Sequence, residues 1–409
     1  MLGMKSLNLS KKWGLSPFLN FGKERSLWVS LLSVLIALYL LFSMISISFV
    51  QGFLTLSFIC WFIILFRKEQ KFTFPPFFWP LIVYTALSLV SSLFSVNPSE
   101  SLKDCRDLLL FLIILIIYTG FTSEKAVKKA NLALLASAYI SCLYALYYFI
   151  FKALPAERIE GFMGQVMTQG GLLLLFSSMA LSMFLFSRKR IRYLWGLGFL
   201  LSLIALALTL TRNAWVGLVV AVSIILFFYK PKTLILVPIV IGIFLFIGPQ
   251  SLKKRALSIF SSEAISNRER IEFFHAGIKI IKDYPLLGTG PNTVEEVYQD
   301  SKYGLSERTK KNVHLHNNIL QIGAERGIPT LLAWFTFMIW VFLSLIKLLK
   351  NKDPTLRPFT IAALSALCAI STAGLFEYNF HDSEITALFL YMIAIPFSLA
   401  RIQKTEQQE

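Results

Sequence analysis

The sequence predicts an all-α, polytopic membrane protein with about twelve transmembrane helices and one large, partly helical loop. Hydrophobic residues make up 56% of the 409 residues, charged residues make up only 15%, and the mean hydropathy is +0.65. A soluble domain usually carries about 25% charged residues. The apolar residues gather in blocks of roughly 17–23, the length that a helix needs to cross about 30 Å of hydrocarbon. Because backbone groups in lipid must be paired within the chain, we expect these blocks to be helices.

Twelve apolar blocks are predicted to span the membrane, and the Pro and Gly residues that interrupt the chain mostly fall between them. Neighbouring blocks meet near Ile47, Arg212 and Pro231, where the chain must turn tightly. The predicted spans are 28–47, 48–66, 77–95, 107–122, 129–151, 165–186, 193–211, 213–229, 233–249, 318–346, 358–375 and 384–400.

The short loops predict the orientation, because Lys and Arg are enriched on the cytoplasmic side of a membrane. If the N-terminus is cytoplasmic, every short loop on that side is basic, as in residues 188–192. The opposite short loops are poor in basic residues or balanced by acids, so both termini are predicted to be cytoplasmic. The chain then divides into a cytoplasmic N-terminus (1–27), nine spans (28–249), an outer loop (250–317), three spans (318–400) and a cytoplasmic tail (401–409).

The net charge of +17 raises the question of a nucleic-acid partner. A nucleic-acid surface would gather its Lys and Arg on one folded face, whereas here they punctuate the apolar blocks. We therefore expect membrane lipids as partners and no nucleic acid. The first 27 residues are basic and polar, and the apolar block after them is too long for a cleavable signal. The cysteines form no CxxC or metal-spaced pair and are interpreted as packing residues: Cys60, Cys105, Cys142 and Cys368.

The outer loop is polar and basic although it lies on the side where basic residues are rare. Long loops cross the membrane largely regardless of charge, so a merely solvated loop is one reading. The other interpretation is that the loop folds into a binding or catalytic site. Residues 267–282 place Ile271, Phe274, Ile278 and Ile281 at helical spacing, with Ser266 or Asn267 as a candidate cap. Arg268 and Arg270 would stand near the N-terminus of this amphipathic helix, where both they and the helix dipole attract phosphate.

The end of the outer loop carries two of the four histidines, His314 and His316, just before the tenth span. A neutral imidazole at a membrane interface can act as a general base or as a hydrogen-bond donor near pH 7. Metal binding is the competing interpretation of His-x-His, but no cysteine and no convergent set of acids accompanies the pair in sequence. We therefore predict no metal at this position.

Two further segments bring charge to the outer side. Arg212 interrupts an apolar run without an acidic neighbour, which indicates a function unless the side chain merely snorkels to the interface. Residues 374–384 contribute Glu377, His381, Asp382 and Glu384, which could bind hydroxyl groups or pair with the arginines. Arginines and a histidine gathered on one face suit a pyrophosphate-linked lipid donor, because arginine stabilises a leaving pyrophosphate and histidine can deprotonate an acceptor hydroxyl.

At these residues the sequence resembles the O-antigen ligase/polymerase family of bacterial inner-membrane glycosyltransferases. The matching segments occur in this order within about residues 195–400, with the large outer loop between spans nine and ten, while the N-terminal half resembles the family only in hydropathy. Phe274 stands where the family usually has Trp, and Asn213 stands where Gly is common. The matching segments are 211–217, 270–274 with 284–290, 314–321 with 324–327, and 376–384.

The resemblance implies a GT-C-like fold and transfer of an undecaprenyl-pyrophosphate-linked glycan at the periplasmic face, without a metal or other cofactor. Carried over residue by residue, Arg212 and Arg270 would bind the pyrophosphate and His316 would be the catalytic base. The segment 314–317 looks closer to ligases, which makes the lipid A–core sugar the expected acceptor. The supporting or acceptor-binding candidates are His314, Asn317, Glu377 and Asp382.

Three alternatives stay open at this point. A polymerase or a protein O-oligosaccharyltransferase of the same family would use the same chemistry on another acceptor. A transporter would show inverted repeats and ionisable residues near the centres of its spans. The sequence shows no convincing repeat, and its charges lie at the ends of the spans, so transport is the least favoured of the three.

Overall fold

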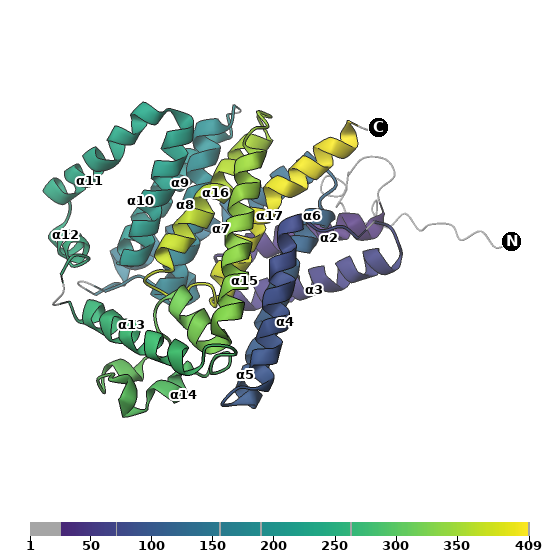
Figure 1. Ribbon diagram of the computed structural model, residues 1–409. Coiled ribbons are helices and arrows are strands. Elements are labelled where there is room, and N and C mark those ends of the chain that lie inside the picture. Colours follow the sequence, from purple (N-terminus) through teal and green to yellow (C-terminus); the bar gives the residue numbers. More distant parts are fainter. Residues whose placement is uncertain (1–25, 71, 155–156, 189, 262–263, 408–409) are drawn as a thin grey trace.

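The computed structural model describes residues 26–70, 72–154, 157–188, 190–261 and 264–407, and these residues form helices joined by short loops (Figure 1). The predicted cytoplasmic N-terminus therefore lies almost wholly outside the described residues. Eight segments are long and apolar enough to cross a membrane, which confirms the all-α, polytopic class. These are α3 (Ile47–Phe66), Pro76–Leu93 containing α4 (Trp79–Leu93), α7 (Glu124–Phe151), α8 (Val166–Phe186), α10 (Arg212–Tyr229), α15 (Asn318–Leu348), α16 (Leu356–Ala373) and α17 (Ser383–Glu406).

The other four predicted spans also coincide with helical segments, but these are shorter. Three are apolar: α2 (Leu27–Phe42), α9 (Arg192–Leu208) and Pro231–Ile247, which contains α11 (Leu236–Ile247). The fourth, predicted as residues 107–122, is divided between a 3₁₀ helix (Cys105–Phe111) and the nine-residue α6 (Leu112–Gly120). Residues 113–117 of α6 are all buried, and the segment packs against α17. Its hydropathy therefore reflects burial inside the bundle, and the number of twelve crossings stays a prediction.

The centre of the bundle is formed by α8, α16 and α17, whose apolar stretches are 83%, 78% and 83% buried inside the protein. Helix α10 packs against α16 and α8. This close approach depends on Gly217, because a Cβ atom there would lie 2.8 Å from the carbonyl oxygen of Ala369. Since Arg212 begins α10, the tight packing fixes the height at which its side chain emerges from the bundle.

Loops predicted for one side of the membrane meet at one end of the structure. The guanidinium group of Arg401 donates to the carbonyl oxygen of Tyr118, while Gln403 donates to Glu124 and to Asp353. These residues come from three loops or helix ends that the charge pattern places on the cytoplasmic side. The outer-side segments meet at the opposite end in the same way, so the structure agrees with the predicted alternation of the loops. Which end faces the cytoplasm stays a prediction.

The segment between α11 and α15 folds into a small helical unit at that opposite end (Figure 1). It contains α12 (Gln250–Leu257), α13 (Ile265–Asp283) and α14 (Val294–Tyr298). The short helix α5 (Pro98–Asp104) belongs to a different segment, the loop after α4. Phe273, Ile280 and Tyr298 are fully buried in a core of their own, together with Leu315 and Leu320. The reading of this segment as a merely solvated loop is therefore wrong.

The unit is fastened to α15 through backbone hydrogen bonds. The N–H groups of Thr289 and Gly290 donate to the carbonyl oxygens of Ala324 and Glu325 at 2.9 and 2.8 Å. Helix α15 is broken at Gly327, whose φ of 79° lies in the left-handed region, and a Cβ atom there would lie 2.1 Å from a carbonyl oxygen of the unit. Two segments that carry the family resemblance, 284–290 and 324–327, thus dock on each other.

Candidate active site

Helix α13 forms one wall of the site. The face that it buries differs from the apolar face that the sequence predicted. Its buried face consists of Phe273, Ala276, Gly277 and Ile280, with Ile278 and Ile281 packed at the edge of the same core. Ile271 and Phe274 are half-exposed instead, at 51% and 50%. The apolar face is wider than one helical stripe, so the periodicity alone did not distinguish the core side from the side that faces the cavity.

A cavity of about 510 Å³ lies between α13, the start of α10, the start of α15 and the loop after α16. It brings together Arg212, Arg270, His316 and Asn317, which come from three separate parts of the sequence. The wall between these polar groups is largely apolar. The remaining lining residues are Asn213, Val216, Ile259, Phe260, Ser261, Asn267, Ile271, Phe274, His275, Leu315, Leu320, Leu375 and Phe376.

Arg212 is 6% exposed and is held by hydrogen bonds to the outer unit. One terminal nitrogen donates to the carbonyl oxygen and the hydroxyl group of Ser258 at 2.6 and 3.1 Å. The other donates to the hydroxyl group of Ser266 at 2.7 Å and to Asn267 Oδ1 at 2.8 Å. Ser266 and Asn267 lie inside the first turn of α13, which begins after Ala264, so the expectation that either caps the helix is wrong. They serve as acceptors for Arg212.

Arg270 enters the cavity from the opposite wall. Its Nε donates to the carbonyl oxygen of Phe376 at 3.1 Å, and its terminal nitrogens make no hydrogen bond to a described residue. Burial lowers the pKa of Arg270, and Glu377 opposes this effect. The side chain stays charged at neutral pH, because the ordinary pKa of arginine is far above 7.

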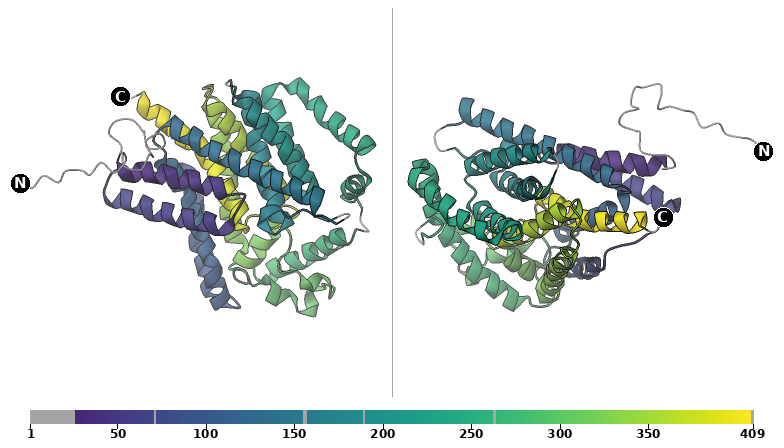
Figure 2. Two further views of the ribbon diagram at one scale, coloured as in Figure 1. Left: turned by 180° about the vertical axis from the view of Figure 1, so that it is seen from behind. Right: turned by 90° about the horizontal axis from the view of Figure 1, so that it is seen from above.

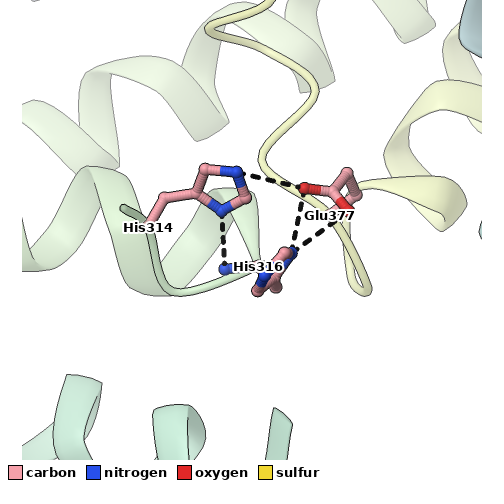
Figure 3. Close-up of side chains that lie close together, drawn as sticks. All are labelled: His314, His316 and Glu377. Carbon is pink, nitrogen blue, oxygen red and sulfur yellow. Dashed lines mark hydrogen bonds and ion pairs between the residues drawn. The ribbon is translucent and has the colours of Figure 1, made fainter. Parts of the chain in front are cut away.

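The imidazole of His316 and that of His314 share the carboxylate of Glu377 (Figure 3). The Nδ1 atom of His316 lies 3.1 and 3.2 Å from the two carboxylate oxygens, and Nε2 of His314 lies 3.5 Å from one of them. The backbone N–H of His316 donates to Nδ1 of His314 at 3.3 Å, so the hydrogen of the neutral His314 ring must lie on Nε2, toward Glu377. Both histidines therefore present N–H groups to a single carboxylate.

The backbone at His316 is strained, with a φ of 49° in the left-handed region. This conformation costs about 1–3 kcal/mol for a residue other than glycine and persists where the surroundings fix it. Here Phe273 packs against the His316 ring at a centroid distance of 5.6 Å, and Asn317 caps α15 through the N–H groups of Ile319 and Leu320. The strained turn aims the His316 ring at Glu377 and into the cavity.

The surroundings set the charges of Glu377 and His314. Burial would raise the pKa of Glu377, but His316, His314 and Arg270 outweigh it and lower the pKa to about 2. Burial lowers the pKa of His314 to about 4, although Glu377 opposes this effect. At neutral pH the group therefore contains an ionised carboxylate and a neutral His314.

We expect His314 to make the protein less stable as the pH falls from 6.5 toward 4. In this range the unfolded chain binds a proton at His314 that the folded chain does not, so the stability is full above pH 6.5 and declines below it. The midpoint of thermal unfolding of purified protein should show a flatter decline between pH 7 and pH 5 in His314→Gln than in the wild type. Identical slopes would contradict this assignment.

The other predicted supporting residues lie in two different places. Asn317 lines the cavity and also donates to the carbonyl oxygen of Leu375 at 2.9 Å. Asp382 lies outside the cavity lining: its carboxylate caps α17 at Ile385 and accepts a hydrogen bond from Thr168 at 2.5 Å. The geometry thus gives Asp382 a structural role at the start of α17.

The segment 324–327 also has a structural role. Arg326 is 5% exposed and donates to Asp104 at 2.9 Å, to Glu325 at 3.0 Å and to the hydroxyl group of Tyr378 at 3.1 Å. This buried network ties the end of α5 to α15 and to the loop after α16. A buried arginine that is paired in this way stabilises one arrangement of the chain.

Among the described residues, two groups bring three side chains of metal-binding type within 4.8 Å of one another. They are His314 with His316 and Glu377, and Asp104 with Asp107 and His381. In the first group Nδ1 of His314 already accepts a hydrogen bond, and a metal on Nε2 would have to replace the hydrogen that this nitrogen carries. In the second group Asp104 is paired with Arg326. The contacts already made by these side chains do not require a cation.

The fold and the cavity define a multi-pass membrane protein in which one helical unit covers a site lined by arginine and histidine. Residues 197–335 match the model of the O-antigen ligase family, in agreement with the resemblance seen in the sequence. The matched region contains Arg212, Arg270 and His316, whereas Glu377 lies beyond it. The family indicates a ligase-like function and a glycosyl-transferring activity.

Two relatives from Rickettsia carry the provisional name of polysaccharide ligase. The protein from Rickettsia felis is 24% identical over 319 residues, which cover 73% of this chain and 74% of the relative. The protein from Rickettsia conorii is 27% identical over 327 residues, which again cover 73% of this chain and 74% of the relative. The similarity therefore extends well beyond the segments that first suggested the family.

The structure adds partners that the sequence did not assign. Glu377 was expected to bind hydroxyl groups or the arginines, but its closest partners are the two histidines. Ser258, Ser266 and Asn267 were not recognised as the residues that hold Arg212. The partners in these contacts lie 46 to 63 positions apart in the chain, and no local sequence pattern indicates contacts over such separations.

Proposed function

We propose that this chain is an O-antigen ligase of the bacterial inner membrane. It transfers O-antigen polysaccharide from undecaprenyl pyrophosphate to the lipid A–core oligosaccharide at the periplasmic face, with inversion and without a metal. The observation that carries the proposal is the convergence of Arg212, Arg270 and His316 on one cavity of about 510 Å³. From the predicted orientation we infer that this cavity faces the periplasm.

His316 is positioned to accept a proton. Its Nδ1 faces Glu377, and its Nε2 lies 3.3 Å from Asn312 Oδ1 on the other edge of the ring. Two oxygen acceptors at the two ring nitrogens suit the imidazolium that forms when the ring takes up a proton. Glu377 orients His316 and stabilises its positive charge in the same way that a carboxylate supports the histidine of a hydrolase triad.

The chemical step then involves one bond formed and one bond broken at the anomeric carbon. The acceptor hydroxyl oxygen attacks this carbon while its proton passes to His316. The bond between the carbon and the pyrophosphate oxygen breaks, and its electron pair leaves with the pyrophosphate. Arg270 and Arg212 stabilise the negative charge that develops on the leaving group.

A transfer assay with purified components tests this proposal. The full chain in detergent would receive a polyprenyl-pyrophosphate glycan and a lipid A–core acceptor, and the product would be resolved by gel electrophoresis. We expect glycan to appear on the core. Transfer only onto a second lipid-linked glycan would identify a polymerase instead, and the absence of transfer by the wild-type protein would contradict the proposal.

A gene-deletion experiment separates the two transferases in cells. Loss of a ligase leaves bare core while lipid-linked polymer accumulates, whereas loss of a polymerase leaves core that carries a single repeat. We expect the first pattern. The second pattern would mean that the site carries out the same chemistry on a different acceptor.

A further inference from the structure

Two arginines that the proposed mechanism does not use, Arg158 and Arg255, hold the turn from which Arg212 emerges. The Nε atom of Arg158, in the loop after α7, donates to the carbonyl oxygen of Thr209 at 3.0 Å, and a terminal nitrogen donates to the hydroxyl group of Thr211 at 3.3 Å. From the other side, the Nε atom of Arg255 on α12 donates to the carbonyl oxygen of Leu210 at 3.0 Å. Two guanidinium groups therefore hold residues 209–211, directly before Arg212.

The turn between them is strained. Leu210 has a φ of 53°, a left-handed conformation that is rare for a bulky side chain. The loop that carries Arg158 is fixed on the same turn, because the N–H of the buried Ile159 donates to the carbonyl oxygen of Leu208 at 3.1 Å. The positions of both arginines are thus fixed by the fold beside the turn that leads into Arg212.

These arginines differ from the other buried arginine of this end of the structure. Arg326 pairs with Asp104 and Glu325. By contrast, Arg158, Arg212, Arg255 and Arg270 form no ion pair with any carboxylate in the described parts of the chain, and their hydrogen bonds go to carbonyl, hydroxyl and amide oxygens. Unpaired charges that are partly removed from water are costly. Such a group is expected to be completed by an anion from outside the chain.

The charges of these arginines also act on one another. Burial lowers the pKa of Arg158, and the nearby Arg255 lowers it further. Burial is the largest effect on the pKa of Arg270, which Arg255 also lowers. Arg255 therefore lies within electrostatic reach of both the loop after α7 and the wall of the cavity formed by α13.

We propose that Arg158 and Arg255 form, beside Arg212, an anion subsite that receives the pyrophosphate of the lipid product after glycan transfer. This inference rests on the proposed function, since it assigns the leaving group of that reaction. Both side chains use their Nε edge on the turn and keep terminal N–H groups for a ligand: both nitrogens of Arg255 and one of Arg158 make no hydrogen bond to a described residue.

Charge explains why such a subsite favours the product over the donor. In the donor the pyrophosphate is a diester, esterified by the lipid at one end and by the sugar at the other, and it carries two negative charges. When the bond to the sugar breaks, the electron pair stays on the terminal phosphate oxygen and adds a third negative charge. Guanidinium groups that lie close to this additional charge stabilise the transition state and the product more than they stabilise the bound donor.

Binding of two short lipid ligands to the purified full-length protein tests the inference. Farnesyl pyrophosphate represents the product monoester, and a farnesyl-pyrophosphate sugar represents the donor diester. In Arg158→Gln and in Arg255→Gln we expect the affinity for farnesyl pyrophosphate to fall roughly tenfold, the effect of losing one charge-assisted hydrogen bond. The affinity for the diester should fall less. Lys254→Gln, which removes an exposed charge from the same helix, is the matched control.

The outcomes separate this inference from the proposed function. Unchanged farnesyl pyrophosphate binding in both variants, or equal losses for both ligands, would overturn the product subsite while transfer by the wild type still supported the ligase. Absence of transfer by the wild type would instead remove the proposed function. Arg158→Lys and Arg255→Lys retain the charge, so partial recovery of monoester binding in folded Lys variants is expected, and its absence would count against the electrostatic role.

Discussion

Replacing His316 with alanine is expected to lower the rate of glycan transfer by about 10²–10⁴-fold, the usual contribution of a general base. The imidazole of His316 lies in the cavity and can take the acceptor proton while Glu377 stabilises the resulting charge. The rate would be measured with purified protein and a polyprenyl-pyrophosphate glycan. Because the His316 side chain is only 21% exposed and pairs with the buried Glu377, its truncation should also lower the midpoint of thermal unfolding, so the rates are compared at a temperature where the variant is folded.

A second histidine provides the control for this experiment. His381 lies outside the cavity, stacked on Tyr378 with ring centroids 5.2 Å apart, so His381→Gln should retain transfer. If His316→Ala transferred glycan at the wild-type rate, the assignment of the base would be wrong. If both variants lost activity together with their thermal stability, the effect would be one of folding.

Truncation of the two cavity arginines should give losses of different kinds. Arg270→Ala removes a side chain with a single hydrogen bond to the protein, so we expect kcat/KM to fall about 10- to 100-fold with little change in stability. Arg212→Ala also removes four hydrogen bonds to Ser258, Ser266 and Asn267. It should therefore lose transfer and about 2–4 kcal/mol of stability.

Lysine substitutions distinguish charge from geometry at these positions. A lysine ammonium group has three donors and lacks the planar fork of arginine. Arg212→Lys should thus recover only part of the stability, because it cannot satisfy four acceptors. Equal thermal midpoints for Arg212→Ala, Arg270→Ala and the wild type would show that the hydrogen bonds of Arg212 do not hold the outer unit in place.

Hydropathy and charge were sufficient to predict the helices, and they drew attention to Arg212 and His316, which the structure brings together at one cavity. Arg212 and His316 are recognisable because a charge in an apolar run and a rare histidine at an interface are unusual locally. The broken helix at residues 105–120 could not be predicted, because burial inside a bundle and exposure to lipid favour the same apolar residues. The orientation of α13 was missed for a similar reason, since Phe273 and Phe274 are adjacent and equally apolar.

The remaining features depend on contacts between distant segments. Glu377 pairs with a histidine 61 residues away, and the segment 324–327, which resembles a functional motif, joins α15 to α5 and to the loop after α16 through Arg326. Helix α11 shows the opposite case: none of its residues is buried, and it lies at the edge of the bundle in every view (Figure 2). The sequence predicted α11 as a membrane span in the same way as the central helices, because lipid-facing and core helices have the same apolar composition.

The hydrogen bonds of Arg212 have a consequence for substrate affinity. Both of its terminal nitrogens are already occupied by Ser258, Ser266 and Asn267, so a pyrophosphate can use them only by taking the place of these oxygens. Binding at Arg212 is then an exchange between two sets of acceptors, and the chain's own loop acts as an internal competitor. The measured dissociation constant reports the difference between the two sets. A variant with weaker loop acceptors, such as Ser266→Ala, would bind the same donor more tightly without gaining a single contact to it.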